Sequence, residues 1–212
     1  MRGDSNKIVI LGGGGHAKVL IDLMHTQDDY EVAGILDSGL EKSSKVLGVP
    51  VLGGDELLND LFKMGVKMAC IGVGSVKDNS IRKRLYEKAK QIGFLIPPLS
   101  HPHACISKEA KLSEGAQVMA GAIIQVSALI GENTIINTAA TVEHDCIIGR
   151  DVHICPGAVV SGGVSIGDNV FVGAGATVIQ GIKIGEGALI GAGSLVLSDV
   201  HAGQKVVGVP AR

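Results

Sequence analysis

The hydrophobic pattern of the second half of the chain has a period of six. Every sixth residue from Ile106 to Val196 is isoleucine, leucine or valine, and the residue four positions after each of them is mostly small or β-branched. Neither a helix nor a simple alternating strand has this period. It is typical of a chain that turns a corner every six residues, so that three repeats make one triangular coil. The pattern therefore predicts a parallel β-helix.

Stacked coils would bring like side chains together. Adjacent coils lie at the inter-strand spacing of about 4.8 Å, so residues three repeats apart form columns in the interior. One predicted column contains Ile106, Ile124, Val142, Val160, Val178 and Val196, and another contains Ile136, Ile154, Val172 and Ile190. We expect these columns to form the core of the second half.

The first half has the pattern of a small α/β domain. A buried strand at residues 7–12, a loop of four glycines, a helix from His16 to about Thr26 and a strand at residues 31–37 form a βαβ unit. Further elements are expected as a helix at 55–64, a strand at 68–74 and a helix at 79–92. About three parallel strands are predicted, which is half of a Rossmann-like fold.

A proline-rich segment separates the two patterns. Pro97, Pro98 and Pro102 cannot continue a helix, so we expect a linker at residues 97–103. The predicted organisation is a small α/β domain at 1–96 and an all-β left-handed parallel β-helix with a C-terminal tail at 104–212. The left-handed winding departs from the usual right-handed crossover rule and is expected from the resemblance described below.

Composition supports this picture and excludes some partners. The chain has 31 glycines, no tryptophan and 2% aromatic residues, which suits tight corners around a narrow interior. Its net charge of −2 without a basic cluster does not favour nucleic acid or an anionic membrane. No apolar run reaches the roughly 18 residues of a membrane span, and four cysteines lack CxxC spacing, so a cytoplasmic protein with reduced thiols is expected.

The glycine-rich loop carries the first candidate chemistry. Gly12 to Ala17 fits the pattern G-x-G-x-x-A, and Asp37 ends the second strand, as in a dinucleotide-binding fingerprint. The glycines would allow backbone amides at the start of the helix to approach a phosphate. Because the domain is only half of a dinucleotide fold, the sequence favours a nucleotide diphosphate carrying a sugar over NAD.

The combined motifs resemble the sialic acid O-acetyltransferase and bacillosamine N-acetyltransferase family of hexapeptide-repeat enzymes. The resemblance rests on Gly14-Gly15-His16, Asp37, Gly72 and Gly74 followed by Arg82-Lys83, Asn137-Thr138 before Glu143-His144-Asp145, and the tail Gly208-Val209-Pro210-Ala211. It implies that His144 is the general base and that Asp145 raises its basicity. Histidine exchanges a proton near neutral pH, which suits an amine attacking a thioester. From the residues alone, Glu143 remains a rival to Asp145 as the carboxylate that orients His144.

The same resemblance implies the binding sites. His153, Ala174 and Ala192 would contact acetyl-CoA, the co-substrate, in a groove between two solenoids of a homotrimer. Residues Gly14, Gly15, His16, Asp37, Ser38 and Gly74 would line the nucleotide-sugar pocket. No metal is expected. Cys146 and Cys155 are not expected to act as nucleophiles, because Cys146 occupies an interior position and Cys155 has no evident base.

The predicted function is N-acetylation of the amino group of a 4-amino-4,6-dideoxy sugar linked to a nucleotide, with UDP leading, in surface glycan biosynthesis. Sialic acid O-acetylation and N-acetylation of a GDP-linked amino sugar are alternatives. More remote are a zinc enzyme like the γ-class carbonic anhydrases, which would need three converging histidines, and a non-catalytic regulator of sugar synthesis. His144 and His153 lie half a coil apart in sequence, and we expect them to meet only across a subunit boundary.

Overall fold

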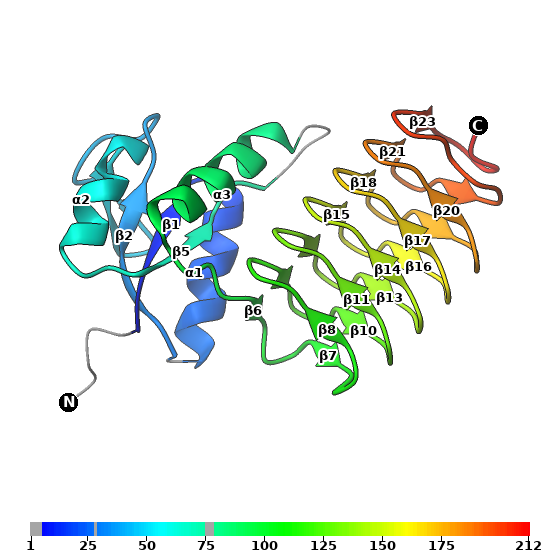
Figure 1. The fold of residues 1–212 in the computed structure, drawn as a ribbon, viewed down its shortest axis with the longest axis horizontal. Helices are drawn as coiled ribbons and strands as arrows, with labels where there is room; N and C mark the ends of the chain where they lie inside the picture. The colour runs from blue at the N-terminus through cyan, green and yellow to red at the C-terminus, as the bar shows by residue number, and fades with distance from the viewer. Residues whose placement is uncertain (1–5, 28, 75–78) are drawn as a thin grey trace. The chain divides into compact units, whose positions relative to one another are not determined.

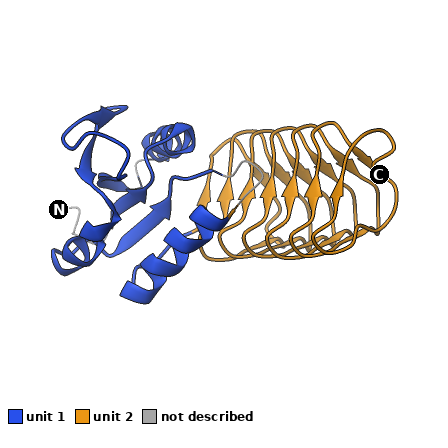
Figure 2. Cartoon of the chain, turned by 90° about the horizontal axis from the view of Figure 1, so that it is seen from above, with its two compact units in different colours: residues 1–76, 80–97 blue, residues 77–79, 98–212 orange. Residues whose placement is uncertain are grey.

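The computed structural model describes residues 6–27, 29–74 and 79–212 and divides the chain into two compact units (Figures 1 and 2). The first unit ends at Pro97, and the second runs from Pro98 to Arg212 and includes Asn79. Within the described residues, no helix is long and apolar enough to cross a membrane. Each unit has its own hydrophobic core.

The first unit is a five-stranded mixed sheet with helices. Its strands are β1 (Lys7–Leu11), β2 (Glu31–Leu36), β3 (Lys45–Val46), β4 (Val49–Gly53) and β5 (Met68–Ile71), in the spatial order β3-β4-β2-β1-β5. Its helices are α1 (Gly15–Gln27), the 3-10 helix η2 (Asp55–Leu57), α2 (Leu58–Lys63) and α3 (Ser80–Ile92). The βαβ unit predicted from the sequence is formed by β1, α1 and the parallel strand β2.

The sheet is larger than the three parallel strands that the sequence predicts. Strand β4 adds a fourth parallel strand beside β2, and β3 pairs with β4 in an antiparallel hairpin. The sequence signal was weak because β4 is short and contains Pro50, which cannot donate a ladder hydrogen bond. Helix α1 begins at Gly15, so the loop after β1 ends one residue earlier than predicted.

The second unit is a parallel β-helix with three sheets, which confirms the fold predicted from the six-residue period. Its two-residue strands are β6 (Leu99–Ser100), β7 (Cys105–Ile106), β8 (Lys111–Leu112), β9 (Gln117–Val118), β10 (Ile123–Ile124), β11 (Leu129–Ile130), β12 (Ile135–Ile136), β13 (Thr141–Val142), β14 (Ile147–Ile148), β15 (His153–Ile154), β16 (Val159–Val160), β17 (Ser165–Ile166), β18 (Phe171–Val172), β19 (Thr177–Val178), β20 (Lys183–Ile184), β21 (Leu189–Ile190), β22 (Leu195–Val196) and β23 (Lys205–Val206). The left-handed sense of the winding stays a prediction.

Both predicted columns are formed. The first runs through the sheet β22-β19-β16-β13-β10-β7, where Ile124 pairs with Val142 and Val142 with Val160. The second runs through the sheet that contains β12, β15, β18 and β21. These aliphatic side chains and the small residues of each repeat are buried together in one core. Stacked branched side chains in register explain how the unit is stable with few aromatic residues.

The solenoid begins inside the segment predicted as a linker. Strand β6 pairs with β9, and the N–H groups of Leu99 and His101 donate to the carbonyls of Ala116 and Val118 at 2.8 Å. The prolines exclude a helix here, but Leu99 and His101 keep the N–H groups that a parallel ladder needs. The first coil therefore starts earlier than residue 104.

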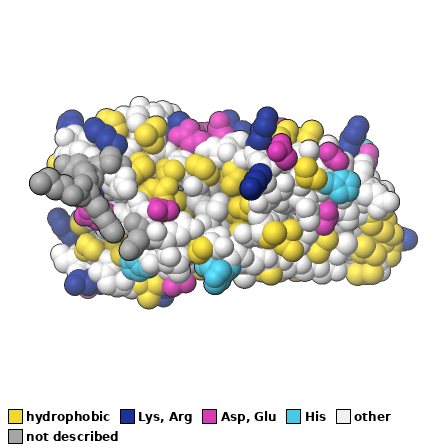
Figure 3. Space-filling view, turned by 90° about the horizontal axis from the view of Figure 1, so that it is seen from below, with side chains coloured by type: hydrophobic (Ala, Val, Ile, Leu, Met, Phe, Trp, Pro, Cys, Tyr) yellow, Lys and Arg dark blue, Asp and Glu magenta, His cyan; other side chains and the backbone are white. Residues whose placement is uncertain are grey.

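Apolar side chains also gather on the surface. Leu129 of β11 pairs with Ile147 of β14, and the two residues are 40% and 53% exposed. Figure 3 shows groups of exposed apolar side chains on one face of the protein. Leu129 and Ile147 form a short apolar strip, which ends at Lys111 and Ser165 in the next stacked positions.

Candidate functional site

The turn after β13 presents His144 and Asp145 to solvent. Asp145 has φ of 58°, a left-handed conformation that aspartate tolerates better than most residues. In the equivalent turns of neighbouring coils this position is occupied by Ser127, Gly163 and Gly181, and these residues also have positive φ. The repeat therefore requires a tight corner at this place, and the side chains of His144 and Asp145 are 58% and 66% exposed beside it.

A hydrogen bond fixes the imidazole of His144. Its Nδ1 lies 2.8 Å from Oδ2 of Asp145. An ionised carboxylate only accepts hydrogen bonds, so Nδ1 carries the proton and donates it to Asp145. In the neutral ring Nε2 then holds the lone pair, which is the arrangement that a general base needs. Of the two carboxylates that the sequence leaves open, Asp145 makes this contact.

His153 lies in β15, on a different sheet from the turn after β13. Its side chain is 6% exposed and packs edge-on against Phe171, with ring centroids 5.5 Å apart. Its Nε2 lies 3.0 Å from Nδ2 of Asn137, whose Oδ1 accepts from the backbone N–H of Thr138. The amide thus turns its NH₂ group to the ring, so Nε2 accepts and the neutral ring carries its proton on Nδ1.

Ala174 and Ala192 occupy adjacent corners of neighbouring coils. The corner after β18 contains Ala174, the corner after β21 contains Ala192, and the N–H of Gly193 donates to the carbonyl of Ala174 at 2.8 Å. Both alanines are exposed. These corners belong to the sheet of His153, whereas His144 follows a strand of another sheet. The single chain therefore groups its predicted acetyl-CoA residues along one sheet and its predicted base along another.

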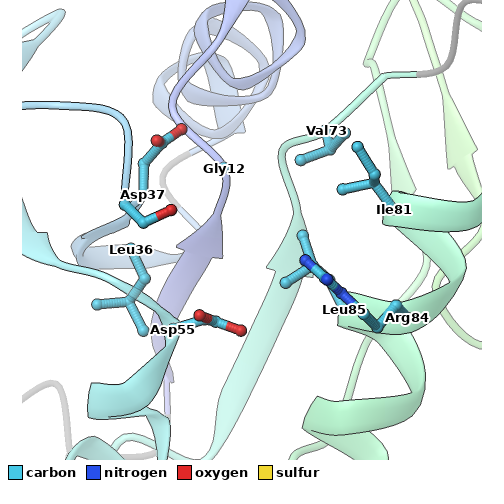
Figure 4. A pocket seen from close by; sticks show the side chains of 9 residues that line it. Gly12, Leu36, Asp37, Asp55, Val73, Ile81, Arg84 and Leu85 are labelled. Carbon is cyan, nitrogen blue, oxygen red and sulfur yellow. The ribbon is translucent and has the colours of Figure 1, made fainter.

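The first unit contains a cavity at the carboxyl ends of β1 and β2 (Figure 4). Its lining residues are Gly12, Leu36, Asp37, Ser38, Asp55, Val73, Ile81, Arg84 and Leu85. Crevices at the carboxyl ends of parallel strands are where open α/β sheets bind ligands. Of the residues predicted for the nucleotide-sugar pocket, Asp37 and Ser38 line this cavity.

Asp37 also shapes the loops around the cavity. Its Oδ2 accepts the N–H of Gly13 at 2.7 Å, and its Oδ1 accepts the N–H of Gly39 at 2.8 Å. The carboxylate thereby joins the glycine-rich loop to the turn after β2. Each oxygen keeps a further lone pair for a ligand.

The remaining predicted pocket residues lie around the start of α1. At Gly14 and Gly15 an added Cβ would meet no atom of the described residues within 4 Å, so these residues leave open space at both positions. Gly74 and His16 are neighbours, because a Cβ at Gly74 would lie 3.3 Å from the Cβ of His16. These residues do not line the cavity of Figure 4, and their role in a nucleotide-sugar pocket stays a prediction.

Two charged residues of the cavity were missed by the sequence analysis. Asp55 lies at the start of η2, and Arg84 extends from α3 on the opposite side (Figure 4). Lys88 donates a hydrogen bond of 2.8 Å to Oδ2 of Asp55, and this bond lowers the pKa of the Asp55 carboxyl. The available signal was the spacing of Arg84 and Lys88, which places both side chains on one face of a helix.

The three buried cysteines lie in surroundings that disfavour nucleophilic chemistry. Burial raises the pKa of the Cys155 thiol to about 12, and that of Cys70 to about 12 as well. Burial also raises the pKa of Cys146, whose thiol donates to the carbonyl of Ser161 at 3.1 Å. A thiol acts as a nucleophile through its thiolate, which these surroundings disfavour. No three His, Cys, Asp or Glu side chains gather in a metal-binding group anywhere in the described ranges.

Both halves of the chain match known families. Residues 7–89 match the family described as PglD N-terminal domain, and residues 127–162 and 163–198 match bacterial transferase hexapeptide repeats. The chain is 37% identical over 118 residues to UDP-N-acetylbacillosamine N-acetyltransferase of Bacillus subtilis strain 168. That match spans 53% of this chain and 51% of the relative, about half the length of each.

Solved structures match nearly the whole chain. PerB from Caulobacter crescentus, in complex with CoA and GDP-perosamine, is 40% identical with a TM-score of 0.91, and the match covers 97% of this chain and 96% of PerB. The acetyltransferase domain of PglB from Neisseria gonorrhoeae, in complex with acetyl coenzyme A, is 37% identical with a TM-score of 0.91 and covers 98% of both chains. The likeness therefore includes both units.

Proposed function

The chain belongs to the PglD-like family of hexapeptide-repeat acetyltransferases, and on that premise we propose that it transfers the acetyl group of acetyl-CoA to the amino group of a nucleotide-linked amino sugar. The observation that carries the proposal is the pair of His144 and Asp145, with 2.8 Å between Nδ1 and Oδ2. A histidine held in this way offers an unprotonated Nε2 to an incoming amine.

The proposed reaction is a direct transfer. The neutral sugar amine attacks the thioester carbonyl carbon and gives its proton to Nε2 of His144, while Asp145 stabilises the imidazolium that forms. The bond between the acetyl carbon and sulfur then breaks, and the proton on Nε2 passes to the departing thiolate. An amide and free CoA result, and no covalent acyl-enzyme is required.

We assign the substrates to the two units. The cavity with Asp37 and Ser38, and the open loop at Gly14 and Gly15, would hold the nucleotide and its phosphates, since helix N-termini attract anions. The exposed corners at Ala174 and Ala192, with His153 on the same sheet, would hold acetyl-CoA. Small side chains at stacked corners leave room for an extended arm along the solenoid.

The sugar is proposed to be a 4-amino-4,6-dideoxyhexose, with UDP or GDP as its nucleotide. The curated relative from B. subtilis acts on a UDP-linked sugar, whereas PerB was solved with GDP-perosamine. The uridine form is our first candidate, and the guanosine form is the second because PerB resembles the chain over almost its full length.

A coupled assay tests the proposal. The purified protein is incubated with acetyl-CoA, a thiol reagent and either UDP- or GDP-linked 4-amino-4,6-dideoxyhexoses. We expect CoA release that requires one of the sugars, together with a product heavier by one acetyl group. The matched controls omit the sugar or use the same sugar with the amine already acetylated. Sugar-independent CoA release, or no release with any of the sugars, would contradict the proposed function.

A further inference from the structure

The residue that stacks on His144 in the next coil is Gly162. An added Cβ at Gly162 would lie 2.6 Å from Nε2 and 2.7 Å from Cε1 of His144, and the three nearest atoms among the described residues all belong to that ring. Real Cβ atoms do not approach other atoms so closely, so the imidazole occupies the space that a side chain at Gly162 would fill. The edge of the ring nearest to Gly162 carries the proposed basic nitrogen.

The corner itself does not require this glycine. The first positions of the equivalent turns in neighbouring coils are Val126, His144 and Gln180, so side chains are tolerated there. Gly162 is also not among the residues with positive φ, in contrast to Gly163, which has φ of 67°. Backbone geometry therefore explains Gly163 and leaves Gly162 unexplained.

Other glycines of the solenoid differ from Gly162 in what surrounds them. Gly131 and Gly167 would place a Cβ against backbone atoms of the next coil, at 2.7 Å from Arg150 N and Glu186 N respectively. Those positions are needed for coil stacking. At Gly162 the obstacle is an exposed and rotatable side chain, so a substitution would displace the ring without breaking the solenoid.

From these contacts we infer that Gly162 is a positioning residue, which leaves the space that holds the His144 ring in its hydrogen bond with Asp145. The inference rests on the proposed function. Asp145 holds the ring through Nδ1. Because Gly162 has no side chain, Cε1 and Nε2 of the ring can lie in the space next to it. With a Cβ at residue 162 the ring turns outward, and Nε2 leaves the position from which it takes the proton. Displacement of a catalytic group by about 1 Å costs up to a hundredfold in rate.

A double-mutant cycle tests the inference. We expect Gly162→Ala to lower kcat by about tenfold to a hundredfold, with KM for both substrates within about threefold and an unchanged melting temperature. In a His144→Ala background the same change should have no further effect, because Gly162 acts through the ring. Gln180→Ala, at the equivalent position one coil further, is the matched control and should retain wild-type kcat.

Unchanged kcat in Gly162→Ala would overturn the inference. So would a decrease of equal size in the His144→Ala background, since Gly162 would then act independently of the ring. A crystal structure of Gly162→Ala gives a readout that does not depend on activity: loss of the hydrogen bond between His144 and Asp145 supports the inference, and its retention contradicts it. Absence of acetyl transfer by the wild-type protein would refute the proposed function, and this crystal structure would still test the role of Gly162.

Discussion

At the scale of single residues, the proposed function depends on the orientation of one imidazole. His144 is exposed at a corner and is held by Asp145 through Nδ1. Exposed side chains ordinarily sample several rotamers, so a fixed ring at this place needs a partner. The conformation of Asp145, with positive φ, lets a residue adjacent in sequence provide that partner.

His144→Ala should lower kcat by at least about a hundredfold and leave KM for acetyl-CoA within a few fold. Positioned proton transfer contributes typically 10² to 10⁴ in rate, and the alanine removes only this contribution. Steady-state kinetics with the acetylated product measured directly would check it. If His144→Ala kept a tenth or more of the wild-type kcat, His144 would not be the general base.

Asp145→Asn should lower kcat by at least about tenfold, while Glu143→Gln should behave like the wild type. Asparagine tolerates the left-handed conformation of this corner, and its side-chain oxygen can still accept a hydrogen bond from the Nδ1–H group. It carries no charge, however, to stabilise the imidazolium. Comparing kcat of the two variants shows which of the two carboxylates assists His144. A larger loss in Glu143→Gln than in Asp145→Asn would reverse the assignment.

At the scale of elements, the loop between β1 and α1 combines two kinds of glycine. Gly12 has φ of 97°, and a Cβ there would clash with Val73, so the fold itself requires glycine. Gly14 has no neighbouring atom within 4 Å of an added Cβ. None of the described residues fills this space, and a phosphate at the start of α1 is the proposed occupant.

Gly14→Val should therefore raise KM for the nucleotide sugar by about tenfold, which corresponds to about 1.4 kcal/mol, and spare acetyl-CoA binding. The fold should tolerate this change, since no atom of the described residues lies within 4 Å of an added Cβ at Gly14. Gly12→Ala is the comparison variant, and it should lower the melting temperature of the first unit. If acetyl-CoA affinity fell and sugar affinity did not, the assignment of substrates to the two units would be reversed.

At the scale of the whole molecule, one chain separates the proposed base from the proposed acetyl-CoA residues. His144 and the corners at Ala174 and Ala192 belong to different sheets of the solenoid. Neighbouring coils also present Leu129 and Ile147 on the surface, an apolar strip that a second copy of the chain would cover. Three copies around a threefold axis would bring the base of one chain to the acetyl-CoA residues of the next.

We therefore predict a homotrimer with a mass of about three times the 21.7 kDa of the chain. Light scattering coupled to gel filtration measures this directly. Ile147→Glu should weaken the association and lower activity together, because a charge would be buried in the strip. Thr177→Glu, in a neighbouring sheet of the solenoid, is the comparison variant. A fully active monomer would exclude a site shared between chains.

The sequence by itself determined the solenoid and its columns, from Ile106 to Val196. A repeat of six fixes which residues stack, because every coil has the same length, so contacts between residues far apart follow from counting. The same regularity predicted that His144 and His153 lie on different sheets. Strand β4 was not predicted, because a short segment that contains Pro50 has no recognisable alternation of hydrophobic and polar residues.

Only the tertiary structure decided where side chains point and what they meet. The sequence places Glu143 and Asp145 equally close to His144, and it does not predict the rotamer that brings Oδ2 of Asp145 to Nδ1. Counting places Gly162 three repeats after His144, but only the folded structure shows that the His144 ring lies against it. The physical reason is that a repeat specifies the backbone position of each residue, whereas the direction of an exposed side chain depends on the neighbours that the folded coils bring to it.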